Sequence, residues 1–237
     1  MNPLQRRFKR EIEEMAEVCH AAAERQYTTS HGGNLSWRVA PDAVLITPTK
    51  VNKGKIRFDD IVIVGMDKRV RYAAKGRRPT GEVYIHVGIF RKRPDAVSII
   101  HAHPAWITAL ALSKPELLAR AYLPEPTIEV GPVAVTEYAQ PLTDELARTF
   151  DPAIMRHNAF VMRNHGAVVL SLEGLRRCFE LLEMLEMTAK SIAVAEMLGG
   201  ARPLSRKEIK GLTETMRTRN LRLPGAPGAV KKLTDLF

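Results

Sequence analysis

The sequence is short of cysteine, of long apolar runs and of aromatic residues, and the first two shortages each exclude a class of protein. Its 237 residues contain two cysteines, Cys19 and Cys178, so we expect no disulfide framework and interpret both as small apolar core residues in a reducing compartment. The longest apolar runs fall far short of the ~18 residues that a membrane-spanning helix needs. The first residues lead into an acidic amphipathic segment, so we expect no secretory signal and a cytoplasmic location.

Aromatic residues make up only 6% of the chain, which bears on the meaning of its positive charge. There are 36 Lys and Arg residues against 26 Asp and Glu residues, a net charge of +10. The basic residues gather in residues 68–78 and 201–237, where aromatic side chains are too few to form a stacking surface for bases. We therefore expect solvated loops and a basic tail first, and a patch that attracts an anionic substrate second. We expect neither a nucleic-acid nor a membrane partner.

Helical and strand patterns alternate along the chain, without internal repeats or an interdomain linker. Apolar residues spaced by three and four predict helices, and short apolar or alternating runs predict strands. The predicted helices cover residues 3–26, 80–92, 105–112, 173–198 and 205–219, with another that starts at 143. The predicted strands cover residues 35–39, 44–47, 61–64, 70–73, 97–103, 127–130, 133–136, 159–163 and 167–170.

This order predicts an α/β domain in which a sheet carries helices on both faces. Many strands are joined by tight turns, so the sheet should be mostly antiparallel or mixed. We expect a single domain over residues 1–220 and a basic C-terminal tail over residues 221–237, in which residues 224–228 are unstructured. Thr80 is the expected cap of the second helix.

Three histidines stand at predicted strand ends. His101 and His103 close one strand and point to the same face, because side chains alternate along a strand. His-x-His alone is weak evidence, and two ordinary histidines would explain it. His165 precedes Gly166 between two apolar strands, where a glycine lets another group approach closely. Three histidines with an open fourth position are typical of a catalytic zinc site. Structural roles fit the remaining histidines better: His20, His31, His86 and His157.

Glu82 is the natural carboxylate to accompany these histidines. Its structural role would be a favourable interaction with a helix N-terminus, worth about 0.3–1 kcal/mol. Its functional role would be to move a proton beside the metal.

Five short motifs follow one another over roughly residues 5–200. They are Gly33-Asn34-Leu35-Ser36, Ile46-Thr47-Pro48-Thr49, Pro79-Thr80-Gly81-Glu82, Arg93-Pro94-Asp95-Ala96 leading into His101-Ala102-His103-Pro104, and Asn164-His165-Gly166. In order and spacing they resemble the class II aldolase family, which includes L-fuculose-phosphate aldolase, L-ribulose-phosphate 4-epimerase and methylthioribulose-phosphate dehydratase.

The resemblance implies a three-layer αβα fold around a mostly antiparallel sheet, and a homotetramer with active sites at subunit interfaces. It implies a divalent metal held by His101, His103 and His165, zinc first, with Mn²⁺, Co²⁺ and Fe²⁺ as alternatives. Glu82 would be the proton-transfer residue. The residues implied to hold the substrate phosphate are Gly33, Asn34, Thr49, Lys50, Thr80 and Gly81.

The sequence departs from the family pattern at two positions of the phosphate cradle. Gly81 stands where the family has a second hydroxyl residue, so the cradle loses a donor. Lys50 stands where the family has glycine, which brings a cation to the site. A lysine there suits a carboxylate as well as a phosphate.

The leading hypothesis is a metal-dependent lyase that cleaves a ketose 1-phosphate to dihydroxyacetone phosphate and an aldehyde through a metal-stabilised enediolate. Glu82, where the epimerase branch has aspartate, favours a lyase over an epimerase. A decarboxylase or dehydratase on the same metal site, acting on an acidic hydroxylated substrate, is the alternative. A non-catalytic binding module resembling the head of adducin is a third hypothesis, which the retained histidines oppose.

Overall fold

A computed structural model describes all residues 1–237, and its core is one eight-stranded sheet. The strands are β1 (Asn34–Ala40), β2 (Ala43–Ile46), β3 (Val62–Val64), β4 (Val70–Tyr72), β5 (Ser98–Ala102), β6 (Val133–Thr136), β7 (Ala159–Met162) and β8 (Gly166–Ser171). They lie in the order β4-β3-β2-β1-β5-β8-β7-β6. Only the β6–β7 pair is parallel, which confirms the expected mostly antiparallel sheet.

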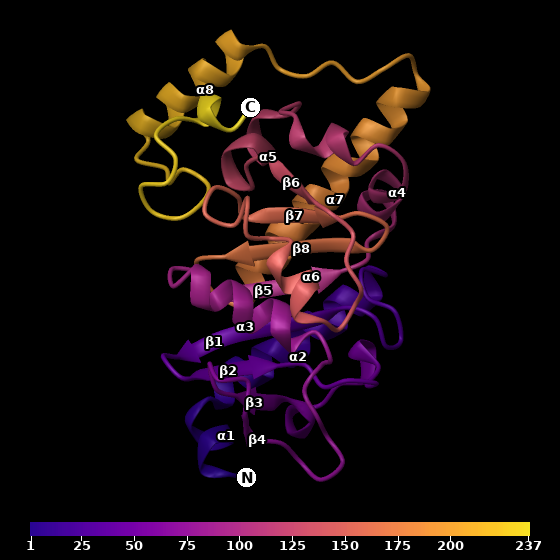
Figure 1. Ribbon diagram of the computed structural model, residues 1–237, viewed down its shortest axis with the longest axis vertical. Helices are drawn as coiled ribbons and strands as arrows, with labels where there is room; N and C mark the ends of the chain where they lie inside the picture. The colour runs from indigo at the N-terminus through magenta and orange to yellow at the C-terminus, as the bar shows by residue number, and fades with distance from the viewer.

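Helices cover both faces of this sheet. They are α1 (Pro3–Arg7), α2 (Lys9–Glu24), α3 (Val83–Lys92), α4 (Ala105–Ser113), α5 (Pro124–Glu129), α6 (Asp144–Arg148), α7 (Leu175–Met197) and α8 (Arg206–Thr218). α2, α4 and α7 pack on one face, and α3 and α6 pack on the other, which gives the expected three αβα layers. Figure 1 shows the strands stacked from β4, near the amino terminus, to β6, near the end that carries α8.

Alternation along the central strands supplies the two cores. In β5, Ile100 faces α2 and α7, whereas Ile99 faces α3. In β8, Val169 faces α2 and α7, whereas Val168 faces α3. All four side chains are fully buried, as expected for a strand covered on both faces.

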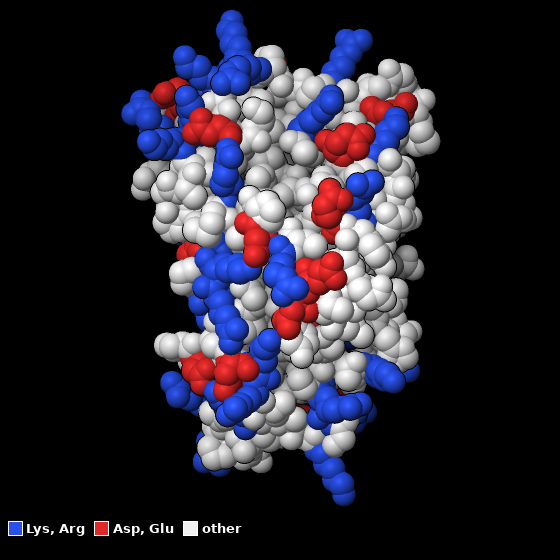
Figure 2. All heavy atoms as spheres, viewed as in Figure 1, with Lys and Arg blue, Asp and Glu red and all other residues white.

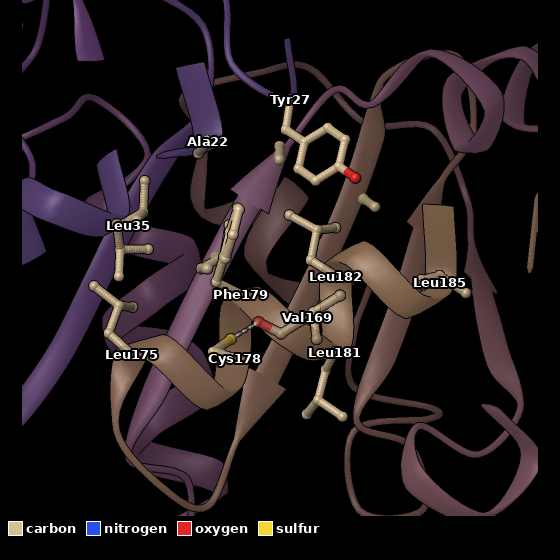
Figure 3. Close-up of a cluster of buried hydrophobic side chains, with 14 of the residues drawn as sticks. Ala22, Tyr27, Leu35, Val169, Leu175, Cys178, Phe179, Leu181, Leu182 and Leu185 are labelled. Carbon is tan, nitrogen blue, oxygen red and sulfur yellow. Dashed lines mark hydrogen bonds between the residues drawn. The ribbon is translucent and has the colours of Figure 1, made fainter. Parts of the chain in front are cut away.

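The larger core lies between the sheet and α7, as Figure 3 shows. Leu175 and Leu182 of α7 are fully buried there. Cys178 donates its S–H to the carbonyl of Val169 at 3.2 Å. Burial raises the pKa of the Cys178 thiol to about 12, and burial likewise raises the pKa of Cys19 to about 12. Both cysteines are free and buried, as expected of inert core residues.

Two predicted elements differ from the structure. The single helix expected over residues 3–26 is broken at Phe8, where the chain turns and inserts the Phe8 ring into the core. The strand expected over residues 127–130 is wrong, because those residues lie at the end of α5. Pro124 is the first residue of that helix, where its missing N–H costs nothing, and this outweighs the β-branched residues that suggested a strand.

The last residues of the chain pack against their own domain. Leu233 is fully buried beside Ile209 and Met216 of α8. The Gly225 N–H donates to Asn158 Oδ1 at 3.2 Å. Residues 224–226 are buried, so the expectation that residues 224–228 are unstructured is wrong for these three, although they form no helix or strand.

On the face seen in Figure 2, acidic side chains lie among the Lys and Arg side chains. None of the helices has both the length and the apolar character that crossing a membrane requires.

Leu233 gives a test of the tail's contribution to stability. Leu233→Ala should lower the free energy of unfolding by about 2–5 kcal/mol, because it removes a fully buried side chain and leaves a cavity. The matched control, Lys231→Ala on the exposed side of the tail, should change it by less than about 0.5 kcal/mol. Urea unfolding measures both, and equal midpoints for the two variants would contradict the packing described.

Candidate active site

The residues singled out from the sequence meet at one end of the central strands. β5 ends at Ala102 and its antiparallel neighbour β1 begins at Asn34, so Asn34 pairs with His101. On the other side of β5, β8 begins at Gly166, and Ala102 pairs with Ala167. The turn that carries His165 therefore lies beside the end of β5.

The three histidines form one cluster. Each offers a ring nitrogen, and these nitrogens lie within 4.8 Å of one another. The ring of His101 lies 4.7 Å from that of His103 and 4.9 Å from that of His165, centroid to centroid. His101 is fully buried, while His103 and His165 are partly exposed, so the cluster is open on one side.

Glycine at position 166 is required by the His103 ring. A Cβ atom there would lie 2.5 Å from His103 Cδ2 and 2.6 Å from the Ala102 carbonyl oxygen. A Cβ atom at Gly32 would lie 3.1 Å from His103 Nδ1. The close approach expected at Gly166 is thus present, and two glycines frame His103.

The protonation of the cluster suits a divalent cation. His101 Nδ1 donates to the Ala167 carbonyl at 2.9 Å, so in the neutral ring Nε2 carries the lone pair. Nε2 is buried without a hydrogen-bond partner and lies 3.3 Å from Glu82 Oε2. Burial and the neighbouring imidazoles lower the pKa of His103 to about 3, and burial lowers the pKa of His165. Neutral imidazoles are the form that binds a metal, so these residues fit one.

Glu82 faces this cluster from the N-cap position of α3. Its Oε1 lies 3.6 Å from His165 Nε2, and its side chain is largely buried. Burial raises the pKa of Glu82, but His101, the hydrogen bond from Asn34 and His165 together outweigh it, so the net pKa lies below the ordinary value. The helix N-terminus also favours the carboxylate.

The two threonine loops of the expected cradle pair with each other. Thr49 N–H donates to the Arg78 carbonyl, and Thr80 N–H donates to the Thr47 carbonyl, both at 3.0 Å. This pairing holds residues 78–80 extended. α3 consequently begins at Val83, and the expectation that Thr80 caps it is corrected.

Lys50 and Gly33 lie on loops beside this pairing. Lys50 has φ +56°, a conformation that favours glycine, and its side chain is exposed. Gly33 has φ +78°, and a Cβ atom there would lie 2.7 Å from Thr28 Cγ2. At Gly81 a Cβ atom would lie 2.7 Å from Leu142 Cδ2.

Several cations near the cradle have no acidic partner. Arg77 pairs with Asp60 at 2.7 Å, and Arg71 pairs with Asp42 at 2.8 Å. Lys50, Lys75 and Arg78 are exposed and form no ion pair. Of these, Lys50 and Arg78 belong to the two paired loops, so they leave uncompensated positive charge for an anionic substrate.

Sequence reasoning missed His86, which was assigned an ordinary structural role. The residue is fully buried on α3, and it contacts Ser36 and Asn34 behind Glu82. The spacing of four between Glu82 and His86 places both on one helix face, and this was the available signal.

The sequence of the chain matches a known protein family. The family model for the class II aldolase and adducin N-terminal domain matches residues 13–193. The chain belongs to this family. The resemblance expected from the five motifs is confirmed, and the three-histidine cluster fits the divalent-metal site that membership implies.

The relatives of the chain are named for two reactions. The 3-oxo-tetronate 4-phosphate decarboxylase of Haemophilus influenzae is 29% identical over 179 residues, which cover 74% of this chain and 83% of the relative. The L-fuculose phosphate aldolase of Methanococcus vannielii is 28% identical over 180 residues, which cover 76% and 94%. The crystal structure of YgbL from Klebsiella pneumoniae, described as a candidate aldolase/epimerase/decarboxylase, has a TM-score of 0.78 at 29% identity, covering 86% of this chain and 98% of that one.

Gly166→Ala tests the metal cluster directly. The added methyl group would meet both the His103 ring and the Ala102 carbonyl oxygen, so it should displace the end of β5 that carries His103 and lower zinc affinity by about 10–100-fold. Isothermal titration of the metal-free protein with Zn²⁺ measures the change. Gly211→Ala in α8, where a Cβ atom meets nothing within 4 Å, is the matched control. Unchanged zinc affinity in Gly166→Ala would contradict a metal site that includes His103.

Proposed function

We propose that the protein is a divalent-metal-dependent decarboxylase of a phosphorylated 3-oxo acid. The observation that carries this proposal is the buried, unpartnered Nε2 of His101 beside the Glu82 carboxylate, within a cluster of three histidines. Family membership and the relatives named as decarboxylases support it. Zinc is the metal we infer, because three imidazoles are a ligand set typical of catalytic zinc.

The proposed reaction is the decarboxylation of a 3-oxo acid. Loss of CO₂ leaves an electron pair on the carbon next to the ketone, and this pair delocalises onto the ketone oxygen as an enediolate. His101, His103 and His165 would hold the metal, which would supply a Lewis acid to stabilise negative charge on that oxygen. Glu82 accepts a proton from water or a substrate hydroxyl and delivers it to the carbon that CO₂ has left.

The chain's exposed cations suit such a substrate. A phosphorylated acid carries two anionic groups, and Lys50 and Arg78 lie without acidic partners on the paired loops next to Glu82. The hydroxyls of Thr49 and Thr80, with the turn at Gly33, are the inferred phosphate contacts. A lysine at position 50 binds either anion as a point charge.

Aldol cleavage of a ketose 1-phosphate is the second candidate. It is favoured by the L-fuculose phosphate aldolase relative, of which the match covers 94%. The bond breaks between C3 and C4, and an aldehyde leaves instead of CO₂. Glu82 would then take the proton of the C4 hydroxyl and return it to C3. Both reactions pass through an enediolate of dihydroxyacetone phosphate, so the same residues serve either one.

We infer further that the chain acts as a homotetramer in the cytoplasm. Apolar side chains at Leu112, Met197 and Leu198 are 61–82% exposed near the C-terminal part of α7, and burying such a surface between subunits is favourable. The exposed cations next to the site support a small anionic substrate rather than a protein partner of the adducin type.

Substrate conversion decides between the two reactions. The zinc-loaded protein should release CO₂ and dihydroxyacetone phosphate from 3-oxo-tetronate 4-phosphate, and should act more weakly on L-fuculose 1-phosphate. Trapped CO₂ and an enzyme-coupled assay for dihydroxyacetone phosphate measure the two products. Faster conversion of L-fuculose 1-phosphate would replace the first candidate by the second, and no conversion of either by metal-loaded protein would overturn both.

Glu82→Gln tests proton transfer. The amide cannot carry the proton, so kcat should fall by about 10²–10⁴-fold while bound zinc stays near the parent level. Glu13→Gln on the exposed side of α2 is the matched control and should keep the parent kcat. Parent-like turnover by Glu82→Gln would remove Glu82 from the mechanism.

A further inference from the structure

His86 is linked to Glu82 by a continuous series of hydrogen bonds. The ring is fully buried, and both of its nitrogens have partners. Ser36 Oγ lies 2.6 Å from His86 Nδ1, and Asn34 Oδ1 contacts His86 Nε2. Asn34 Nδ2 lies 2.6 Å from Glu82 Oε2. We refer to these four side chains as the Ser36–Glu82 chain.

Two periodicities bring the four residues together. Asn34 and Ser36 are two apart on β1, so both point to the sheet face that α3 covers. Glu82 and His86 are four apart at the start of α3, so both point back to the sheet. All four side chains are buried, at 8% exposure or less. Such a network is maintained only if each member finds its partner.

The hydrogen bonds of the Ser36–Glu82 chain run in one direction. An ionised Glu82 can only accept, so Asn34 presents its NH₂ group to the carboxylate and its oxygen to His86. His86 must then carry its proton on Nε2, and its Nδ1 lone pair accepts from the Ser36 hydroxyl. One choice of rotamer and tautomer satisfies every group, and a flipped Asn34 would point its oxygen at the carboxylate.

We propose that His86 is a positioning residue, which holds the Asn34 amide in one orientation and through it directs the Glu82 carboxylate at the metal cluster. Glu82 Oε2 accepts the hydrogen bond from Asn34 Nδ2, while Glu82 Oε1 lies 3.6 Å from His165 Nε2. The kinetic part of this proposal rests on the proposed function; the structural part does not.

Substitution of His86 separates positioning from packing. His86→Leu removes both hydrogen bonds at similar volume, and should lower kcat by about 10–100-fold with KM and bound zinc near the parent values. His86→Gln keeps a donor toward Asn34 and should recover part of the lost kcat. The matched control is Ile89→Val, one turn further along α3, which should lower stability slightly and leave kcat unchanged.

A double-mutant cycle asks whether His86 acts through Glu82. In a Glu82→Gln background, His86→Leu should cause little further loss of kcat, because the group it positions is already disabled. Multiplicative losses in the double variant would overturn the proposal, as would a parent-like kcat in His86→Leu.

Two structural readouts apply even if neither proposed substrate reacts. In ¹⁵N spectra of the metal-free protein, His86 should be the Nε2–H tautomer, and Ser36→Ala should perturb that ring while leaving His157 unchanged. A crystal structure of His86→Leu should place the Glu82 carboxylate away from its position beside His165. An Nδ1–H tautomer, or an unmoved carboxylate, would overturn the inference independently of any activity.

Discussion

A buried imidazole lone pair faces a buried carboxylate, and the rest of the site is arranged around that contact. His101 Nε2 and Glu82 Oε2 lie 3.3 Å apart, with no donor between them in the protein. Two electron-rich atoms in a medium of low polarity repel unless a cation is near. The cluster of His101, His103 and His165 offers three ring nitrogens that lie close enough together to share such a cation.

The sheet and the helix α3 hold His101 and Glu82 in place. His101 sits on β5 between two paired strands, and its Nδ1–H is tied to the Ala167 carbonyl of β8. Glu82 is held at the start of α3, whose buried side chains pack on the same sheet face. The Ser36–Glu82 chain joins these two elements from behind. His101 thus lies within β5, His103 and Glu82 lie directly at the ends of β5 and α3, and His165 lies in the turn before β8.

The two candidate reactions differ in the group that leaves and share the group that remains. CO₂ and an aldehyde depart from the same kind of carbon, and the enediolate left behind needs the same cation and the same proton. This explains why one family contains relatives named for either reaction at nearly equal identity to this chain. Selectivity is therefore expected in the loops around Lys50 and Arg78, where the exposed cations without acidic partners lie.

Much of the architecture and of the site could be predicted from local pattern. Alternation in residues 97–103 placed His101 and His103 on one face, and the glycine after His165 predicted a close approach. The failures have equally local causes. The turn at Phe8 interrupts an apolar stripe that remains helical on both sides, and Pro124 begins a helix where β-branched residues suggested a strand. Residues 224–226 are held by hydrogen bonds from Gly225 to distant Asn158 and from Ala226 to the Met155 carbonyl, which no local pattern contains.

By itself, the sequence determined which side chains share a face, because strand and helix periods depend only on spacing. It thus specified the His101–His103 pair, whereas the pairing of Glu82 with His86 was available in the spacing and was missed. Only the tertiary structure decided that these pairs meet, since that depends on β1 lying beside β5 and on α3 covering both. The packing alone sets the orientation of Asn34, the role of His86 and the ring orientation of His101. Each of these side chains has a hydrogen-bond partner at least 48 residues away in the chain.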